Sequence, residues 1–221
     1  MIGAGMIGRR ALLVAGAAMA CGSNARAELP VPSGRNLAFR LKRHGAVIGT
    51  HTLVFREYGD ALEVDIDVNV LVKFGPFPFV RYSHHNREVW YGDRLVGVSS
   101  HTDRNGTKLH MVASWTDAGL RVEGSGTRPY VAPHDAFATT YWRKSTVFGP
   151  LIGTQDGMLV RPVISQLRPA PIRIASGEEM PAKRYALSGD LNVELWYDPD
   201  DAWAGMRFTA DDGSEVTYER L

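Results

Sequence analysis

Residues 62–74 read LEVDIDVNVLVKF, with an apolar side chain at every second position. One face of this stretch carries Leu62, Val64, Ile66, Val68, Val70, Val72 and Phe74. The other face is polar apart from Leu71, which is typical of a β-strand with one buried and one wet face. At roughly 3.3 Å per residue the strand would run about 40 Å, roughly twice the usual length. The stretch therefore predicts a long ribbon that must curve to bury its apolar face.

The same alternation returns along much of the remaining chain. It predicts strands within residues 37–41, 109–115, 191–197 and 206–208. Dipeptides that suit two-residue hairpin turns separate these runs: Gly59-Asp60, Gly92-Asp93, Asn105-Gly106, Gly189-Asp190 and Asp212-Gly213. We therefore predict an all-β fold, a strongly curved antiparallel meander that forms a half-barrel or an incompletely closed barrel.

Residues 128–150 break the alternating pattern. They contain Pro129, Pro133 and Pro150, which do not suit the middle of a sheet. Within them, residues 135–144 are predicted to form a short helix, with Asp135 or His134 near its start. We expect this helix to act as a lid that covers one end of the curved sheet.

The first 27 residues have the three parts of a secretory signal peptide. Arg9 and Arg10 supply positive charge, residues 11–20 form an apolar run, and small residues stand at Ala25 and Ala27. The apolar run is too short to cross a hydrocarbon core of about 30 Å as a helix. We expect cleavage between Ala27 and Glu28, which leaves residues 28–221 as a single β-rich domain in the periplasm or outside the cell.

Two features of this signal leave the export route and the processing open. Arg9-Arg10 resembles a twin-arginine signal, whereas general secretion needs only positive charge. Cys21 is the sole cysteine and a candidate for lipidation, although the Leu expected three residues before it is absent. If cleavage follows Ala27, the mature chain has no thiol, which excludes disulfides, thiolate catalysis and cysteine metal sites.

The charge balance argues against a nucleic-acid partner. The whole chain has 25 basic and 24 acidic residues. Loss of residues 1–27 removes three arginines, so 22 basic residues face 24 acidic ones and the net charge becomes −2. Such a chain has no general attraction for nucleic acid or for anionic lipid. We expect contact with the membrane only through the export machinery.

Several hairpin signatures together form a recognisable pattern. They are Gly45–Gly49, Glu88–Tyr91, the region of Trp142, Trp196–Asp198 and Gly213–Tyr218. With these residues the chain resembles a family of uncharacterised exported bacterial proteins, a domain of unknown function. It is also distantly similar to a periplasmic family built of long curved antiparallel strands. The resemblance implies this fold and an exported location, and it brings no catalytic residues with it.

Two motif matches in the sequence have simpler explanations. Residues 3–8 match the glycine fingerprint of dinucleotide-binding proteins, but no strand precedes them and they lie in the predicted signal. Residues 65–69 begin like a calcium-binding loop, but Val70 and Pro76 stand where Gly and Glu are required. The acids there are better explained as the wet face of the long strand.

The histidines do not predict a metal site. Six of the seven fall on predicted strands or their ends: His44, His51, His84, His85, His101 and His110. His101 and Asp103 form the best local pair, because residues two apart on a strand share a face. No third ligand is evident, so surface histidines are the preferred interpretation, and we predict neither a metal nor a cofactor.

The aromatic residues suggest a binding function. The chain has five tryptophans, and ordinary packing would account for most of them. They would also line an apolar cavity between the curved sheet and its lid. We expect a binding or carrier protein for a small apolar or lipid-like ligand. The expected ligand contacts are Trp90, Trp115, Trp142, Val64, Ile66, Val68 and Val70.

The alternative is a periplasmic enzyme of hydrolase type. It would gather His, Asp and Glu side chains in one cleft. The sequence contains neither a Gly-x-Ser-x-Gly nor a Ser-x-x-Lys motif, so no catalytic residue is indicated. An outer-membrane barrel is disfavoured, because prolines interrupt the middle of the chain and residues 217–221 lack a terminal aromatic.

Overall fold

The structure is a computed structural model that describes residues 31–74 and 77–221. The predicted signal peptide, its cleavage site at Ala27 and Glu28, the arginine pair and Cys21 lie outside the described residues. The first strands are β1 (Asn36–Arg43), β2 (Ala46–Tyr58), β3 (Ala61–Phe74), β4 (Phe77–Tyr91), β5 (Arg94–Arg104), β6 (Thr107–Thr116), β7 (Gly119–Gly124) and β8 (Thr127–Val131). Within the described ranges, no helix has the length and apolar character needed to cross a membrane.

Shorter elements make up the second half of the chain. They are β9 (Phe137–Ala138), the 3-10 helix η1 (Lys144–Phe148), β10 (Leu151–Ile152), β11 (Leu159–Val160), β12 (Val163–Leu167), β13 (Ile172–Arg173), β14 (Glu179–Met180), β15 (Lys183–Ser188), β16 (Val193–Tyr197), β17 (Trp203–Thr209) and β18 (Glu215–Arg220). The fold is thus nearly all-β, as predicted.

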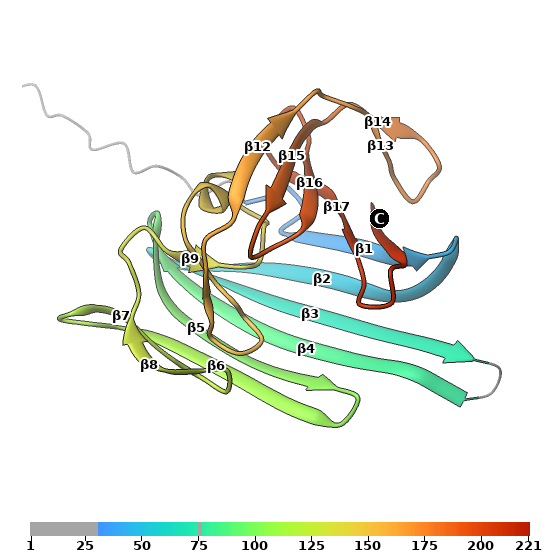
Figure 1. Ribbon diagram of the computed structural model, residues 1–221. Helices are drawn as coiled ribbons and strands as arrows, with labels where there is room; N and C mark the ends of the chain where they lie inside the picture. The colour runs from blue at the N-terminus through green and yellow to red at the C-terminus, as the bar shows by residue number, and fades with distance from the viewer. Residues whose placement is uncertain (1–30, 75–76) are drawn as a thin grey trace, which may run out of the picture.

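In the described part of the chain, thirteen strands form one antiparallel sheet that curls without closing (Figure 1). Their order is β12-β15-β16-β17-β18-β1-β2-β3-β4-β5-β6-β7-β8. β8 and β12 are the two edges, and they do not pair with each other. In Figure 1 the strands β12 and β15–β17 lie above β2–β6, so the sheet encloses a concave side. This confirms the predicted incompletely closed barrel.

The long strand β3 lies between two equally long partners. It pairs with β2 on one side and with β4 on the other over most of its length. Leu62, Val64, Ile66 and Val68 are buried, which confirms the predicted apolar face. On the opposite face Asp65 is buried as well, because it lies between the guanidinium groups of Arg56 and Arg87.

Two of the predicted hairpin turns show the expected chemistry clearly, whereas Gly189-Asp190 and Asp212-Gly213 lie in longer connections of four and five residues, and Asp212 lacks the positive φ of a type I′ turn. Asn105 and Gly106 have φ angles of 53° and 90°, as a type I′ turn requires at its two central positions. Gly59 has φ of 58° at the first central position between β2 and β3, as in a type II′ turn. These tight turns make β2 and β3, and likewise β5 and β6, direct neighbours in the sheet.

One pairing joins the two ends of the described chain. β1 lies between β2 and β18, and Leu41 is opposite Tyr218 in that register. This contact connects the sheet of long strands, β1–β8, to the shorter strands β15–β18. Without it the two groups of strands would form separate sheets.

Residues 132–160, here called the inserted segment, leave the edge strand β8 and return before the other edge strand β12. The segment contains β9, η1, β10 and β11, and its three short strands form a small sheet of their own. The predicted helix at 135–144 was placed wrongly, because the one helical turn of the segment is η1 at 144–148. Residues 135–144 instead form turns and β9, and Tyr141 has a φ of 61° that no helix would accept.

Candidate functional site

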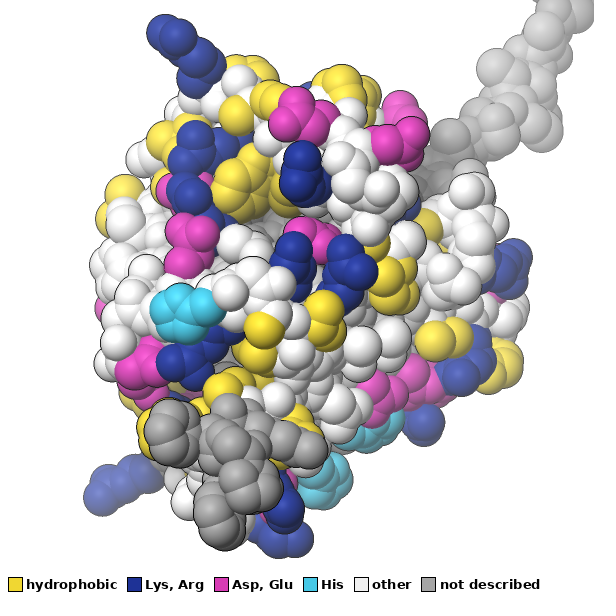
Figure 2. Space-filling model, turned by 90° about the vertical axis from the view of Figure 1, so that its right-hand side faces the viewer, with side chains coloured by type: hydrophobic (Ala, Val, Ile, Leu, Met, Phe, Trp, Pro, Cys, Tyr) yellow, Lys and Arg dark blue, Asp and Glu magenta, His cyan; other side chains and the backbone are white. Residues whose placement is uncertain are grey.

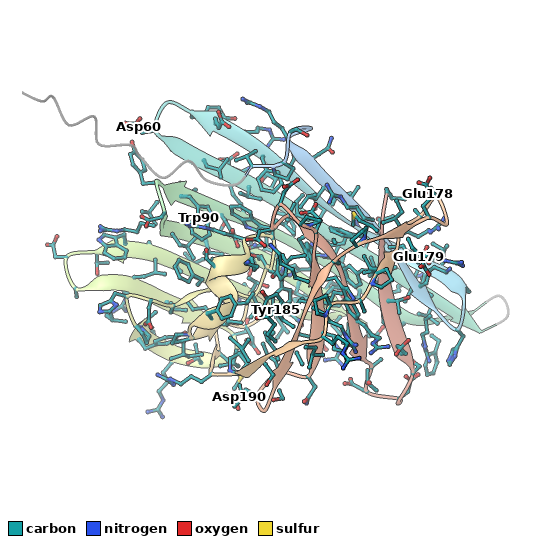
Figure 3. The ribbon with its side chains drawn as sticks, turned by 90° about the horizontal axis from the view of Figure 1, so that it is seen from above. Asp60, Trp90, Glu178, Glu179, Tyr185 and Asp190 are labelled. Carbon is teal, nitrogen blue, oxygen red and sulfur yellow. The ribbon has the colours of Figure 1, made fainter. Side chains whose placement is uncertain are left out.

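The concave side of the sheet brings together most of the predicted ligand contacts. Six of the seven belong to one core or pack against it: Val64, Ile66, Val68, Val70, Trp90 and Trp142. Figure 3 shows Trp90 in the interior beside the inserted segment. Trp115 does not join them, because it is 41% exposed and lies beneath the guanidinium group of Arg94.

The inserted segment covers this concave side. The Trp142 ring lies 5.2 Å from the Phe55 ring, and the Trp90 ring stacks on Phe137 at 5.7 Å between ring centres. Four further segment side chains are almost fully buried: Val147, Leu151, Ile152 and Ala138. The predicted lid is therefore an irregular chain segment that fills the interior, with one turn of helix in it.

A buried carboxyl group, that of Glu88, holds the inserted segment to the sheet. Oε2 accepts hydrogen bonds from the indole N–H of Trp90 at 2.8 Å and of Trp142 at 2.9 Å. Oε1 accepts one from the Thr140 hydroxyl at 2.7 Å. Trp142 and Thr140 belong to the inserted segment and Trp90 to the sheet, so one side chain connects both.

No donor among these three carries a charge. Burial raises the pKa of Glu88, although the hydrogen bonds that it accepts act in the opposite direction. The cation of Arg143 lies 5.4 Å from the centre of the Trp90 ring, and it donates a hydrogen bond to the Asp93 carbonyl. The carboxyl group is thus held by neutral donors in a site from which water is largely excluded.

Two buried histidines lie further along the same concave face. His51 and His84 are both opposite Val68, one on each side of β3. Burial and the nearby His84 lower the pKa of His51 to about 3, and burial lowers that of His84 to about 4. His84 Nδ1 is 2.8 Å from the Thr102 hydroxyl oxygen.

The ring of His51 is enclosed by aromatic side chains. Its centre lies 5.3 Å from Trp203 and 5.7 Å from Tyr218, both in edge-on orientation. Neither ring nitrogen of His51 has a hydrogen-bond partner among the described residues. A buried polar group in this condition destabilises the fold.

The opposite, solvent-facing side of β3–β5 carries two adjoining clefts of about 600 and 280 Å³. We call them the outer trough; both are lined by Asn69, Ser83 and Asp103. The smaller cleft adds Asp67, His85 and His101. Figure 2 shows the end of the molecule to which β3 and β4 run, where acidic, basic and apolar side chains are interspersed.

The comparisons with known proteins concern the fold rather than these sites. A family named Domain of unknown function (DUF6134) matches residues 39–221. The chain belongs to this family. Curated proteins gave no match. The chain is similar to a solved structure, a β-barrel-like protein of domain of unknown function DUF1849 from Brucella abortus, with 9% identity and a TM-score of 0.56. That match covers 84% of this chain and 94% of the other.

All the residues of both sites lie within the stretch that matches the DUF6134 family. The likeness to the DUF1849 protein shows that the chain has a fold seen in a second uncharacterised family. Together with the family match, it confirms the predicted resemblance to an uncharacterised all-β family. The export that the sequence predicts for this chain stays a prediction.

The sequence did not point to Glu88 as an interior residue. Along β4 the buried face carries His84, Asn86, Glu88 and Trp90, so three of its four members are polar. Alternation alone would therefore assign this face to solvent. The one available signal was the pairing of β4 with β3. Because the apolar face of β3 was unambiguous, the residues of β4 on the same side of the sheet had to be buried as well.

Proposed function

We propose that the protein is an exported carrier that holds an apolar, lipid-like ligand against the concave face of its sheet. One observation carries this proposal: a segment of irregular structure, rather than a second layer of long elements, covers that face. Segments of this kind open at lower free energy than long paired strands. Movement of the inserted segment would expose an apolar surface along β3.

The ligand would have to replace the contacts that the inserted segment makes. Burial of a large apolar side chain contributes about 2 kcal/mol. Four such side chains, Trp142, Val147, Leu151 and Ile152, therefore contribute roughly 8 kcal/mol. At about 0.8 kcal/mol per methylene, about ten methylene groups would match this value. A long acyl chain has that size.

The first test is to identify what the purified protein carries. Solvent extraction followed by mass spectrometry should release apolar material with an acyl chain, and the extracted protein should bind a fluorescent fatty acid. Protein that carries no such material and does not bind the probe would contradict the proposal.

A disulfide between the β7–β8 turn and the inserted segment gives a sharper test. The Gly126 amide donates to the Asp156 carbonyl at 2.9 Å, and a Cβ added at Gly126 would lie 2.9 Å from that of Asp156. Disulfides need about 3.8 Å, so the double variant Gly126→Cys, Asp156→Cys requires only a small shift. The test chain also carries Cys21→Ser.

The oxidised form should bind the fatty-acid probe much more weakly than the same protein after reduction. The reduced double variant is the matched control, since its sequence is identical. Equal binding by both forms would show that the inserted segment does not need to move at this point.

An enzyme is the second candidate, and one observation favours it. The smaller cleft of the outer trough gathers Asp67, His85, His101 and Asp103, which are residue types used in acid–base catalysis. Hydrolysis of a panel of activated esters, abolished by His85→Asn and kept by His44→Asn, would support this reading. Absence of any turnover would leave the carrier as the preferred function.

A further inference from the structure

A row of titratable side chains crosses four strands on the solvent-facing side of the sheet. Asp67 on β3 is opposite His85 on β4, which is opposite His101 on β5, which is opposite His110 on β6. The sequence separates these residues by up to 43 positions, so only the strand register reveals the row.

The register places the Cβ atoms of neighbouring histidines close together. Directly opposite residues in an antiparallel pair have Cβ atoms about 4.5–5.5 Å apart. His85 and His101 are such a pair, and both line the cleft of about 280 Å³. Space for an ion and its water ligands is therefore present above the two side chains.

A carboxylate orients one of these rings. His85 Nδ1 lies 2.9 Å from Asp67 Oδ1. In the neutral imidazole this nitrogen donates its hydrogen to the carboxylate, which leaves the lone pair of Nε2 free. Metal-binding histidines are commonly held in this way by a carboxylate behind them.

We propose that His85 and His101 together bind one transition-metal ion of the kind that imidazole prefers, such as Cu²⁺ or Zn²⁺, with Asp67 as a positioning residue. Water supplies the remaining ligands, because no group of three or more His, Cys, Asp or Glu in the described part of the chain is placed to hold a metal. Two neutral nitrogen ligands disfavour Mg²⁺ and Ca²⁺, which prefer oxygen. This site does not depend on the carrier function.

The test titrates the full-length protein with Cu²⁺ and with Zn²⁺ in separate calorimetric experiments, with Cys21→Ser in every form so that no thiol competes for the metal. Wild type should bind one ion of either metal at this site, and His101→Asn should weaken binding by more than about tenfold. His44→Asn is the matched control, since His44 is exposed and has a φ of 49° that Asn adopts readily. This control should bind like wild type.

A spectroscopic readout separates ligation from structural effects. Electron paramagnetic resonance of the Cu²⁺ form should show two nitrogen ligands in wild type and one in His101→Asn. Asp67→Asn should keep two nitrogens but weaken binding by about tenfold. No stoichiometric binding by wild type, or equal affinity of His101→Asn and wild type, would overturn the proposal.

Discussion

Glu88 illustrates how one side chain can determine the fit between two parts of this fold. Its carboxyl group satisfies two indole N–H groups and one hydroxyl that are otherwise surrounded by apolar atoms. A donor left without an acceptor in such a place costs about 1–3 kcal/mol. Burial of the carboxyl group is unfavourable by itself, but Glu88 stabilises the fold by accepting the hydrogen bonds of these three buried donors.

Replacement of Glu88 should show how much stability depends on the hydrogen bonds that its carboxyl group accepts. Glu88→Leu leaves the donors of Trp90, Trp142 and Thr140 without an acceptor, so we expect a loss of about 3–6 kcal/mol of unfolding free energy. Glu88→Gln keeps one acceptor oxygen and should cost much less. Urea denaturation measures both, and equal losses would show that the hydrogen bonds contribute little.

The same substitution predicts a pH effect with a defined sign. The pKa of Glu88 is raised in the folded state, so its stabilising contribution is present below the unfolded pKa and is lost as pH rises through the folded value. Glu88→Gln removes this titration. Its stability relative to wild type should therefore improve as pH rises, and a constant difference would contradict the assignment.

The buried histidines predict the opposite trend in acid. His51 and His84 have pKa values of about 3 and 4, below the unfolded value near 6.5. As pH falls from 6.5 to about 4, the unfolded chain takes up protons that the folded chain does not. Stability should then fall by about 1.4 kcal/mol per pH unit for each histidine.

His51→Phe tests this contribution, because phenylalanine keeps the edge-on contacts with Trp203 and Tyr218 but does not titrate. In unfolding measured between pH 4 and 6.5, the variant should lose about 1.4 kcal/mol less per pH unit than wild type as the pH falls. At pH 7 the variant should be at least as stable as wild type, since two unpartnered nitrogens are removed. If the stability of the variant fell with decreasing pH as steeply as that of wild type, the explanation would be wrong.

At the scale of elements, β3 sets the two faces of the sheet. Val64 is fully buried, and the residues opposite it, Phe55 on β2 and Glu88 on β4, carry no positive charge. Val64→Asp should therefore cost several kcal/mol, because the new carboxyl group is buried unpaired or must take up a proton. Asn69→Asp on the exposed face should change stability by less than about 0.5 kcal/mol, and equal effects in denaturation experiments would reverse our assignment of faces.

How well each element could be predicted depended on whether its polar and apolar faces differ. β3 was predictable because its buried face is purely apolar. β4 was not, because Asn86 and Glu88 lie on its buried face. The helix in the inserted segment was predicted at the wrong residues for another reason. The segment packs against Trp90 and Phe55, which are distant in sequence, so no local sequence pattern contains these contacts.

Long-range pairings were also outside the reach of sequence patterns. β1 and β18 are separated by almost the whole domain, yet they pair directly. The row of His85, His101 and His110 depends on the register of three strands, and a shift of one residue would turn these side chains to the other face. Alternation predicts a strand and its faces, whereas the register follows only from the assembled sheet.

At the scale of the whole molecule, two predictions concern different states of the chain. The first is that the exported protein begins at Glu28, because small residues precede it at the positions that signal peptidase requires. N-terminal sequencing of the exported protein checks this. A lipid-modified Cys21 at the amino terminus would show that the chain is processed as a lipoprotein instead.

The second concerns how the sheet and the inserted segment move in the folded protein. We expect residues 132–160 to be a separable cover, while β3 and β4 are part of the stable sheet. Amide hydrogens of the segment should then exchange through local opening that needs less free energy than global unfolding. Those of β3 and β4 should exchange only when the whole domain unfolds.

Hydrogen–deuterium exchange of the folded protein, read peptide by peptide by mass spectrometry, measures this directly. The account predicts that residues 132–160 exchange well before β3 and β4, and that a bound acyl chain raises protection along β3 while the segment stays open. Exchange of the segment and of β3 and β4 at one common rate, with or without a fatty acid, would contradict it.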